Sequence, residues 1–340
     1  MNVRNRLLPL ILIGSILQGC SSLGLDKETS LPYSQETLRD AEKGNSEAQF
    51  DAGVMYYQGI RVEVDKVKAA EWFRKAAEQG YANAQFDLGL MYAKGEGVAQ
   101  DDRQAFEWYL KAAEQGLPEA QANIARMYSE GRGIEKDIGQ ATLWMQKAAR
   151  QEYPVAEYNV ALMYEQGNGL PQDALKAAQW YGRSAEHGLA EGATRVGFLY
   201  LQGEGVMRDE RRAVEWFEKA AKQGDPLAQT QLGIMACNGQ GMKENYKQAS
   251  VWFHQAGVQG FAVAQARLGG LYYKGQGLDK DMRKAYVWLS VAIANGLKDD
   301  SGELASMQRN AEESLTPAEL SKARGVIDRY LKAYQPRADF

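Results

Sequence analysis

The chain has 340 residues, of which 45% are hydrophobic and 25% are charged, a composition typical of folded proteins that excludes a disordered chain. Its formal net charge of −4, with no dense run of Lys or Arg, argues against a nucleic-acid-binding surface. Only two cysteines are present, Cys20 and Cys237, so we expect a fold that does not depend on disulfides.

The N-terminal residues 1–19 have the pattern of a bacterial signal peptide. Arg4 and Arg6 give a positively charged start, and an apolar run follows from Leu7 to Leu17. This run is too short to span a bilayer, which needs about 20 apolar residues. We therefore expect a targeting segment rather than a transmembrane helix.

The apolar run ends at Leu17-Gln18-Gly19-Cys20, which resembles the lipobox of bacterial lipoproteins. The resemblance implies that Cys20 receives the lipid, whose acyl chains anchor the protein at about 0.8 kcal/mol per buried methylene. Gln18 departs from the small or apolar residue usual at its place. Ser21 and Ser22 follow without the Asp that commonly retains such proteins at the inner membrane, which favours the outer membrane. The alternative is a plain secretory signal that happens to end near a cysteine.

Residues 20–33 are then predicted to be a short tether, and residues 34–44 a capping helix. The segment SQETLRDAEK, residues 34–43, is polar. A polar helix at this place would cover the apolar end of a repeat array, which terminal repeats otherwise expose.

A period of 36 residues runs through residues 45–296. It is carried by all seven tryptophans, Trp72, Trp108, Trp144, Trp180, Trp216, Trp252 and Trp288. A glycine column keeps the same step, at Gly59, Gly95, Gly131, Gly167, Gly203, Gly239 and Gly275. Repeats of 20–50 residues are typical of solenoids, propellers and arrays.

The unit itself predicts a pair of helices, as residues 81–116 show. Ala84, Leu88 and Met91 fall at helical spacing, and Gly95 ends the first helix because glycine tolerates the left-handed turn there. A Gly-x-Gly loop leads to Asp101, a good N-cap for the second helix. On that second helix, small alanines permit close helix packing, and the large Trp and Tyr are expected to fill the remaining space. The Asp101 place is held elsewhere by Asp65, Asp137, Asp173, Asp209, Asn245 and Asp281.

Residues 84–116, AQFDLGLMYAKGEGVAQDDRQAFEWYLKAAEQG, resemble the Sel-one-like repeat, a branch of the tetratricopeptide superfamily. The resemblance covers residues 45–296 and implies an all-α, right-handed solenoid of seven 36-residue helix-turn-helix repeats with helical caps. It implies an adaptor or scaffold rather than a particular activity. The first repeat departs from the pattern, since Gly59-Ile60-Arg61 lacks the second loop glycine.

Residues 297–340 are predicted to form a C-terminal helical cap. Residues 299–313 indicate one helix, and Thr316-Pro317-Ala318-Glu319 is a capping box that starts another. An amphipathic stripe follows it, made of Leu320, Ala323, Ile327, Tyr330 and Leu331.

No constellation in the sequence predicts catalysis, a cofactor or a metal site. His187 and His254 lie at different places in their repeats, and Cys237 falls in an apolar helix as a small packing residue. The recurring loop glycines and aspartates are explained by turns and N-caps rather than by phosphate cradles or acid sites. We therefore expect a protein that is not an enzyme.

In tetratricopeptide-like solenoids the first helix of each pair lines the concave face, so columns on that helix are candidates for partner binding. The candidates are Phe50, Val54, Phe86, Leu90, Arg126, Tyr158, Leu162, Arg195, Phe198, Ile234 and Arg267. The apolar members could instead be buried between helices. The residues of a further column change from acidic to basic along the chain: Asp51, Asp87, Asn123, Asn159, Arg195, Gln231 and Arg267. Such a charge gradient would make a partner dock in one fixed direction. The alternative is an accidental trend among solvated surface residues.

These features predict a lipid-anchored scaffold of the cell envelope, on the outer membrane and facing the periplasm. Its partners would be envelope proteins, with the membrane reached through the lipid anchor and no nucleic acid bound. Envelope assembly or polysaccharide export is a setting in which lipid-anchored repeat scaffolds occur. The alternatives are a surface-exposed or released module that binds a host or foreign protein and, less favoured, a peptidoglycan-related enzyme.

Overall fold

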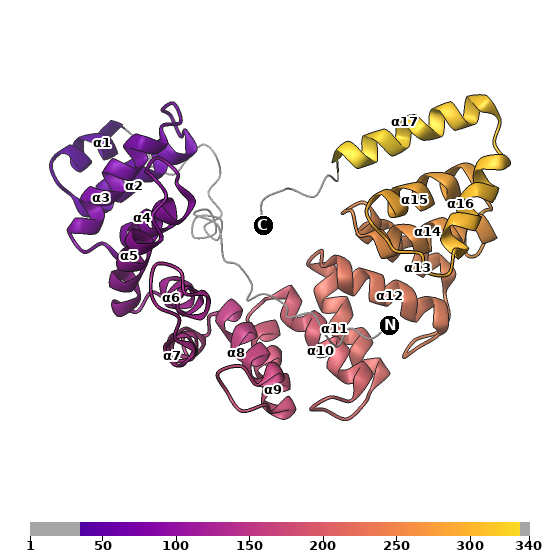
Figure 1. Ribbon diagram of the computed structural model, residues 1–340, viewed down its shortest axis with the longest axis horizontal. Helices are drawn as coiled ribbons and strands as arrows, with labels where there is room; N and C mark the ends of the chain where they lie inside the picture. Colours follow the sequence, from indigo (N-terminus) through magenta and orange to yellow (C-terminus); the bar gives the residue numbers. More distant parts are fainter. Residues whose placement is uncertain (1–34, 334–340) are drawn as a thin grey trace. The chain divides into compact units, whose positions relative to one another are not determined.

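The computed structural model describes residues 35–333, so the predicted signal peptide, Cys20 and the tether lie outside the described residues. Within that range the elements are seventeen α-helices and no strands, which confirms the all-α solenoid of 36-residue helix pairs (Figure 1). The first helices of the seven repeats are α2 (Ser46–Gln58), α4 (Ala82–Lys94), α6 (Pro118–Glu130), α8 (Pro154–Gln166), α10 (Ala190–Gln202), α12 (Pro226–Asn238) and α14 (Ala262–Lys274). The second helices are α3 (Lys66–Glu78), α5 (Asp102–Glu114), α7 (Ile138–Ala149), α9 (Ala174–Glu186), α11 (Glu210–Lys222), α13 (Tyr246–Gly257) and α15 (Met282–Ala294). The flanking helices are α1 (Gln35–Glu42), α16 (Glu303–Glu313) and α17 (Pro317–Ala333).

The described residues form two compact units, residues 35–173 and residues 174–333, called unit 1 and unit 2 here. Within each unit, a first helix packs on the second helix of its own repeat and on that of the preceding repeat. In unit 1 the first helices lie on the concave side of the curve that the pairs describe, most clearly for α6 against α7 (Figure 1). This side of unit 1 is therefore the face expected to meet partners.

The helix boundaries follow the predicted turn residues. Each first helix ends at a glycine in the left-handed conformation, such as Gly95 with φ 69°. Each of six second helices begins after a side chain that accepts a backbone N–H of the first turn, as Asp101 does from Arg103 and Gln104. The others are Asp65, Asp137, Asp209, Asn245 and Asp281. The sequence prediction of Gly ends and Asp or Asn starts is confirmed at these positions.

The second loop glycine is required by a contact with the preceding repeat. A Cβ on Gly97 would overlap the carbonyl oxygen of Lys66, and a Cβ on Gly133 would overlap that of Asp102, in each case at the start of the previous second helix. The first repeat has Arg61 at this place, with a positive φ of 59°. The helix before this repeat is α1, and the residue 31 places before Arg61, where later loops meet the preceding helix, lies outside the described residues. The one departure from the loop pattern therefore falls in the first repeat, which follows α1 in the described residues.

Charged side chains reinforce this loop contact with alternating polarity. Lys66 on α3 lies 2.9 Å from Glu96 in the next loop. One repeat later the signs are reversed, because Asp102 on α5 accepts two hydrogen bonds from Arg132, at 2.6 and 3.3 Å. Half-exposed ion pairs contribute little stability, so their effect is to favour the correct neighbour.

The large side chain buried between the two helices of a repeat belongs to the residue that follows the tryptophan. Seven residues at this position are at most 1% exposed: Phe73, Tyr109, Met145, Tyr181, Phe217, Phe253 and Leu289. A glycine on the facing first helix makes room, since a Cβ on Gly53 would lie 2.5 Å from the Phe73 ring. This glycine column has Ala125 in the third repeat, where the flexible Met145 stands in place of a ring, and Ala161 in the fourth, where Tyr181 keeps the ring.

The expectation that the tryptophans fill the core is therefore wrong for most repeats. Successive helical residues point about 100° apart, so only one of the two neighbouring side chains can face the first helix. Most tryptophans are half-buried at the edge of the core, and a basic side chain one turn later covers the indole. Lys75 lies 3.9 Å from the ring centre of Trp72, and Lys111 lies 4.0 Å from that of Trp108.

This arrangement predicts unequal costs for two adjacent substitutions in unit 2. Phe217→Ala removes a fully buried ring and is expected to lower the free energy of unfolding by about 3–5 kcal/mol. Trp216→Ala removes a half-buried side chain and should cost only about 1–2 kcal/mol. Urea denaturation followed by circular dichroism measures both values, and an equal or larger loss for Trp216→Ala would contradict the assignment of the core.

A buried glutamine connects each of five first helices to the preceding helix. Gln85 donates to the Ala77 carbonyl at 3.0 Å and accepts from the Gln115 amide at 2.7 Å. The same pair of bonds recurs at Gln49, Gln121, Gln229 and Gln265. An unpartnered buried amide costs about 1–3 kcal/mol, so these paired amides fix the register between neighbouring helices. Because the carbonyl that Gln49 meets belongs to Ala41, α1 occupies the place of a preceding second helix.

The C-terminal helices pack on α15. The Thr316–Glu319 capping box is present: the Thr316 N–H donates to the Glu319 carboxylate at 2.9 Å, and the Glu319 N–H donates to the Thr316 hydroxyl at 3.3 Å. The preceding helix begins at Glu303 rather than at 299, because Asp299 accepts the Ala305 N–H and thus caps the turn before the helix. Tyr330 of α17 stacks 4.9 Å from Trp288, which explains why this tryptophan is only 4% exposed.

Candidate functional site

The candidate partner-binding residues all lie on first helices, spread over both units. In unit 1 they are Phe50 and Val54 on α2, Phe86 and Leu90 on α4, Arg126 on α6, and Tyr158 and Leu162 on α8. In unit 2 they are Arg195 and Phe198 on α10, Ile234 on α12 and Arg267 on α14. Members of one helix are three or four residues apart, so the structure brings them onto one face of that helix.

Four of these candidates belong to the core. Val54, Leu90, Tyr158 and Leu162 are at most 5% exposed. Their side chains pack between helices, which is the alternative that the sequence left open for the apolar members. A partner could not reach them without rearrangement of the helices.

The other candidates in unit 1 are half-buried. The Phe50 ring lies 5.2 Å from that of Tyr81 and 5.6 Å from that of Phe73. Phe86 lies 5.5 Å from Tyr109 in the same way, so one side of each ring rests on the core. Their remaining surface, like that of Arg126, is accessible.

The candidates in unit 2 follow the same pattern and become more open toward α14. Phe198 packs edge-on against Phe217 at 5.1 Å, and the Arg195 guanidinium lies 5.5 Å from the Tyr181 ring centre. Ile234 is half-buried and Arg267 is exposed. The reachable candidates are therefore aromatic, aliphatic and cationic side chains in different repeats.

A neighbouring column on the same helices has the most consistent exposure. Its seven members are all half-buried: Tyr57, Ala93, Ser129, Glu165, Leu201, Cys237 and Tyr273. We call it the variable column, because its chemistry changes from repeat to repeat while the buried glycine, alanine and ring positions hardly change. The helical spacing of the sequence already predicts that this column shares a stripe with the candidate columns, but period and spacing do not give its exposure.

The acidic end of the charge column lies in unit 1. Asp87 on α4 is 6% exposed and forms no hydrogen bond or ion pair with the described residues. Burial raises the pKa of Asp87 to about 8. Burial and the nearby Glu47 raise the pKa of Asp51 on α2 to about 6. Asp87 therefore keeps its proton at neutral pH unless a cation approaches it.

The buried hydroxyl of Tyr109 lies near this acidic end. It has no hydrogen-bond partner among the described residues. Burial raises the pKa of Tyr109, and the charges of Arg126 and Asp87 both act on the phenol. Asp87, Tyr109 and Arg126 come from α4, α5 and α6, which are three successive helices of neighbouring repeats.

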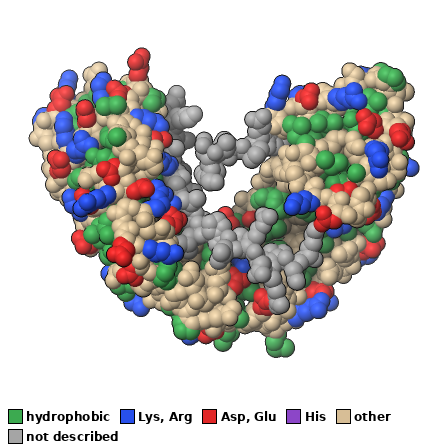
Figure 2. Space-filling model, in the orientation of Figure 1, with side chains coloured by type: hydrophobic (Ala, Val, Ile, Leu, Met, Phe, Trp, Pro, Cys, Tyr) green, Lys and Arg blue, Asp and Glu red, His purple; other side chains and the backbone are tan. Residues whose placement is uncertain are grey.

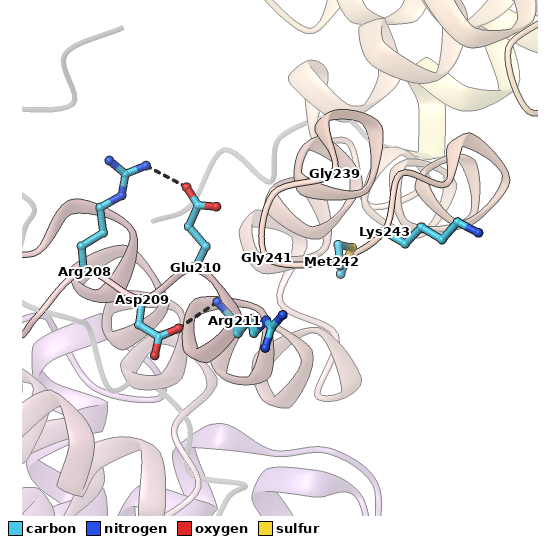
Figure 3. Close-up of a pocket in the computed structure, with 8 residues that line it drawn as sticks. All are labelled: Arg208, Asp209, Glu210, Arg211, Gly239, Gly241, Met242 and Lys243. Atoms are coloured by element: carbon cyan, nitrogen blue, oxygen red, sulfur yellow. Dashed lines mark hydrogen bonds and ion pairs between the residues drawn. The ribbon is translucent and has the colours of Figure 1, made fainter.

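A separate cavity of about 780 Å³ lies in unit 2 between two successive loops (Figure 3). It is lined by Arg208, Asp209, Glu210, Arg211, Gly239, Gly241, Met242 and Lys243. Arg208 pairs with Glu210 at 2.7 Å, and Asp209 accepts the N–H of Arg211 as the cap of α11. Figure 3 shows Lys243 pointing away from the arginines. These hydrogen bonds and ion pairs stabilise the local turn. In the sequence, only the charged residues 208–212 indicate a polar site at this place.

The titratable residues singled out in the sequence lie apart from one another. His254 packs edge-on against Trp288 at 5.7 Å, and burial raises the pKa of the half-buried Cys237 thiol. Residues 35–333 contain no group of three or more His, Cys, Asp or Glu side chains able to hold a metal ion. In the same range, no helix has the length and apolar character needed to cross a bilayer. On the face shown in Figure 2, basic and acidic side chains are intermixed over the described surface.

Comparison with known proteins agrees with this architecture. The model of the Sel1 repeat matches residues 46–81, 82–117, 118–153, 154–189, 190–225, 226–261 and 262–297. A Sel1 repeat protein from Oxalobacter formigenes is 34% identical, with 81% of this chain and 78% of that chain covered and a TM-score of 0.68. An Escherichia coli protein, described as a protective antigen of uropathogenic strains with an SLR fold, is 26% identical over 89% of this chain and 95% of that chain, with a TM-score of 0.50. No match is found among curated proteins.

The repeat matches cover most of the chain, and each spans one first helix, its loop, one second helix and the following turn. Their boundaries lie one residue after those expected from the period, because the match begins at the first residue of the first helix. The chain belongs to the Sel1 repeat family, whose helical solenoids typically serve as protein-binding modules.

Proposed function

We propose that this chain is a lipid-anchored, non-enzymatic scaffold of the cell envelope that binds partner proteins through the exposed face of its first helices. The variable column is the observation that carries the proposal. A surface that is half-buried in every repeat but differs chemically between repeats suits recognition of a partner. The second helices, in contrast, carry the same alanines in every repeat, and most of their tryptophans are covered by a Lys or Arg side chain. These recurrent residues pack the helices together.

Site-specific photo-crosslinking in cells tests the binding face. A photoreactive phenylalanine analogue at Ala93 or Ser129 should give discrete protein adducts, because both positions belong to the variable column. The column already holds Tyr57 and Tyr273, so an aromatic side chain is compatible with the fold there. Matched controls place the same analogue at the exposed Glu71 and Glu107 on second helices. Adducts from the control positions alone, or from none of the four, would refute the assigned face.

The lipid anchor is a distinct part of the proposal and has its own test. Cys20→Ala should abolish incorporation of a labelled fatty acid and move the protein from the membrane fraction to the soluble fraction, since the resemblance to the lipobox places the acyl chains on this cysteine. Ser21→Ala is a matched control beside it that should change neither property. Membrane association that persists in Cys20→Ala would show that another feature holds the protein there.

A second candidate is a scaffold displayed on the outer surface that binds a host or foreign protein. It is favoured by the similar Escherichia coli protein, which is described as a protective antigen. Protease treatment of intact cells separates the two candidates. A chain that is cleaved only after the outer membrane is opened is periplasmic, whereas cleavage on intact cells supports display at the surface.

A further inference from the structure

We propose that a pocket at the C-terminal end of unit 2, called the cap pocket here, binds a short acidic segment of a partner protein that inserts one aromatic side chain. The pocket has a volume of about 290 Å³ and is formed by α13, α14, α15 and α17. It is lined by His254, Tyr272, Arg283, Lys284, Val287, Trp288, Lys322, Ala323, Val326 and Tyr330. None of these residues belongs to the variable column, so the inference goes beyond the proposed function and does not rest on it.

The first step is the apolar interior of the cap pocket. Val287 and Trp288 are only 6% and 4% exposed, whereas Tyr272, Val326 and Tyr330 are half-buried and keep accessible surface. Aromatic rings pack favourably against one another in tilted and edge-on arrangements. A volume of about 290 Å³ is at the lower end of that of ligand sites. The interior therefore fits a single aromatic side chain rather than a folded surface.

This interior is special to the last repeat. In the first five repeats a Lys or Arg side chain three residues after the tryptophan covers the indole, as Lys75 covers Trp72. The seventh repeat has Val291 at that place. Tyr330 of α17 lies 4.9 Å from Trp288 instead. An aromatic ring thus takes the place of the covering cation, and the inside of the pocket stays apolar.

The second step is the charge around this apolar interior. The described residues that line the cap pocket include three full cations, Arg283, Lys284 and Lys322, and no Asp or Glu. Arg283 on α15 and Lys322 on α17 are exposed, and neither side chain has a hydrogen bond or ion pair with another described residue. Cations of this kind form strong, charge-assisted hydrogen bonds with carboxylates, and the Arg guanidinium can hold one with two parallel bonds.

The acidic side chains near the cap pocket are engaged in helix capping. Glu319 lies close enough to Arg283 and Lys322 to be affected by their charge, but its carboxylate accepts the N–H and the hydroxyl of Thr316. Asp281 caps α15 and pairs with Lys284 at 3.6 Å. Arg283 and Lys322 therefore remain available for the carboxylates of a ligand.

The combination of an apolar interior and a cationic surround selects the class of partner. A purely acidic segment would leave the interior in contact with water, and a purely apolar one would make no use of the cations. An aromatic residue next to Asp or Glu satisfies both, because burial of the ring supplies affinity and the carboxylates orient the segment.

Selection from a random 12-residue peptide display library on the purified full chain tests the inference. Peptides that also bind the double variant Arg283→Gln with Lys322→Gln are removed first, so that those recovered depend on the cap pocket. They are expected to combine an aromatic residue with neighbouring Asp or Glu. Replacing that aromatic residue by alanine should weaken binding at least about tenfold. Val326→Phe, which fills part of the pocket without a change of charge, should have a similar effect.

The matched control is Arg309→Gln with Arg329→Gln. It removes two exposed cations of α16 and α17 that do not line the cap pocket, so a recovered peptide should bind it like wild type. Circular dichroism melting checks that each variant is folded, and the alanine replacement in the peptide tests the pocket without altering the protein.

Four results would overturn the inference: recovery of no peptide, peptides without the acidic and aromatic combination, unchanged binding to Val326→Phe, or equal weakening by both double variants. The last result would show general attraction to a positive surface. Failure of the proposed function is a separate outcome, because the adducts at Ala93 or Ser129 report on the first helices of unit 1 and not on the cap pocket.

Discussion

Replacing Gly133 with alanine is expected to lower the free energy of unfolding by about 3 kcal/mol or more. Gly133 has a φ of 70°, which costs an alanine about 1–2 kcal/mol. Its new Cβ would also overlap the carbonyl oxygen of Asp102, where backbone rather than a flexible side chain must move. Overpacking of this kind typically costs a further 1–3 kcal/mol, roughly. Urea denaturation monitored by circular dichroism gives the difference between variant and wild type.

Gly116→Ala is the matched control for this substitution. Gly116 also has a positive φ, of 96°, but a Cβ there would meet nothing within 4 Å. The expected loss is therefore the conformational cost alone, about 1–2 kcal/mol. If the two variants lost equal stability, the contact between the loop and the preceding helix would have no energetic weight, and left-handed backbone geometry would explain both glycines.

Asp87→Asn is expected to make the protein more stable than wild type, by an amount that grows with pH. The pKa of Asp87 is about 8 in the folded protein and near 3.8 when it is exposed. Between these values the folded state holds a proton that the unfolded state has released, so wild-type stability falls as the pH rises. The difference between variant and wild type should be small at pH 4, grow by at most about 1.4 kcal/mol per pH unit, and level off above pH 8.

Asp51→Asn provides an internal comparison for the pH dependence. The pKa of Asp51 is raised only to about 6, so the corresponding difference should stop growing near pH 6. Unfolding midpoints in urea at pH 4, 6, 8 and 9 distinguish the two windows. A difference between Asp87→Asn and wild type that is independent of pH would show that the carboxyl group is not desolvated as the structure indicates.

The sequence predicted the architecture because its signals are local and repeated. Gly95 and Asp101 mark a helix end and a helix start through their own backbone and hydrogen-bonding properties, and the same signals recur every 36 residues. The seven repeats could be placed from that period. The start of α16 could not be placed, because the capping by Asp299 depends on a turn that has no counterpart in the repeats.

Exposure was the property that the sequence did not give. Trp108 and Tyr109 are adjacent and both aromatic, so periodicity could not tell which one faces the first helix. For the same reason Val54 and Leu162 entered the candidate surface although they are buried, and the sequence could not rank them below the half-buried Ala93 and Ser129 of the same stripe. The sequence also could not predict that Asp87 lacks an ion-pair partner, because this depends on which basic side chains lie near it in the folded structure.

The loop contact gives the array a direction for growth. Each interior repeat carries the glycine that receives the preceding helix, whereas the first repeat carries Arg61 at that place. A duplication that copies an interior 36-residue block, such as residues 118–153, inserts a unit that already fits its upstream neighbour. A copy of residues 46–81 moved downstream would press an arginine side chain against a helix start. The array can thus lengthen or shorten through its interior units, while its first unit works only as a beginning.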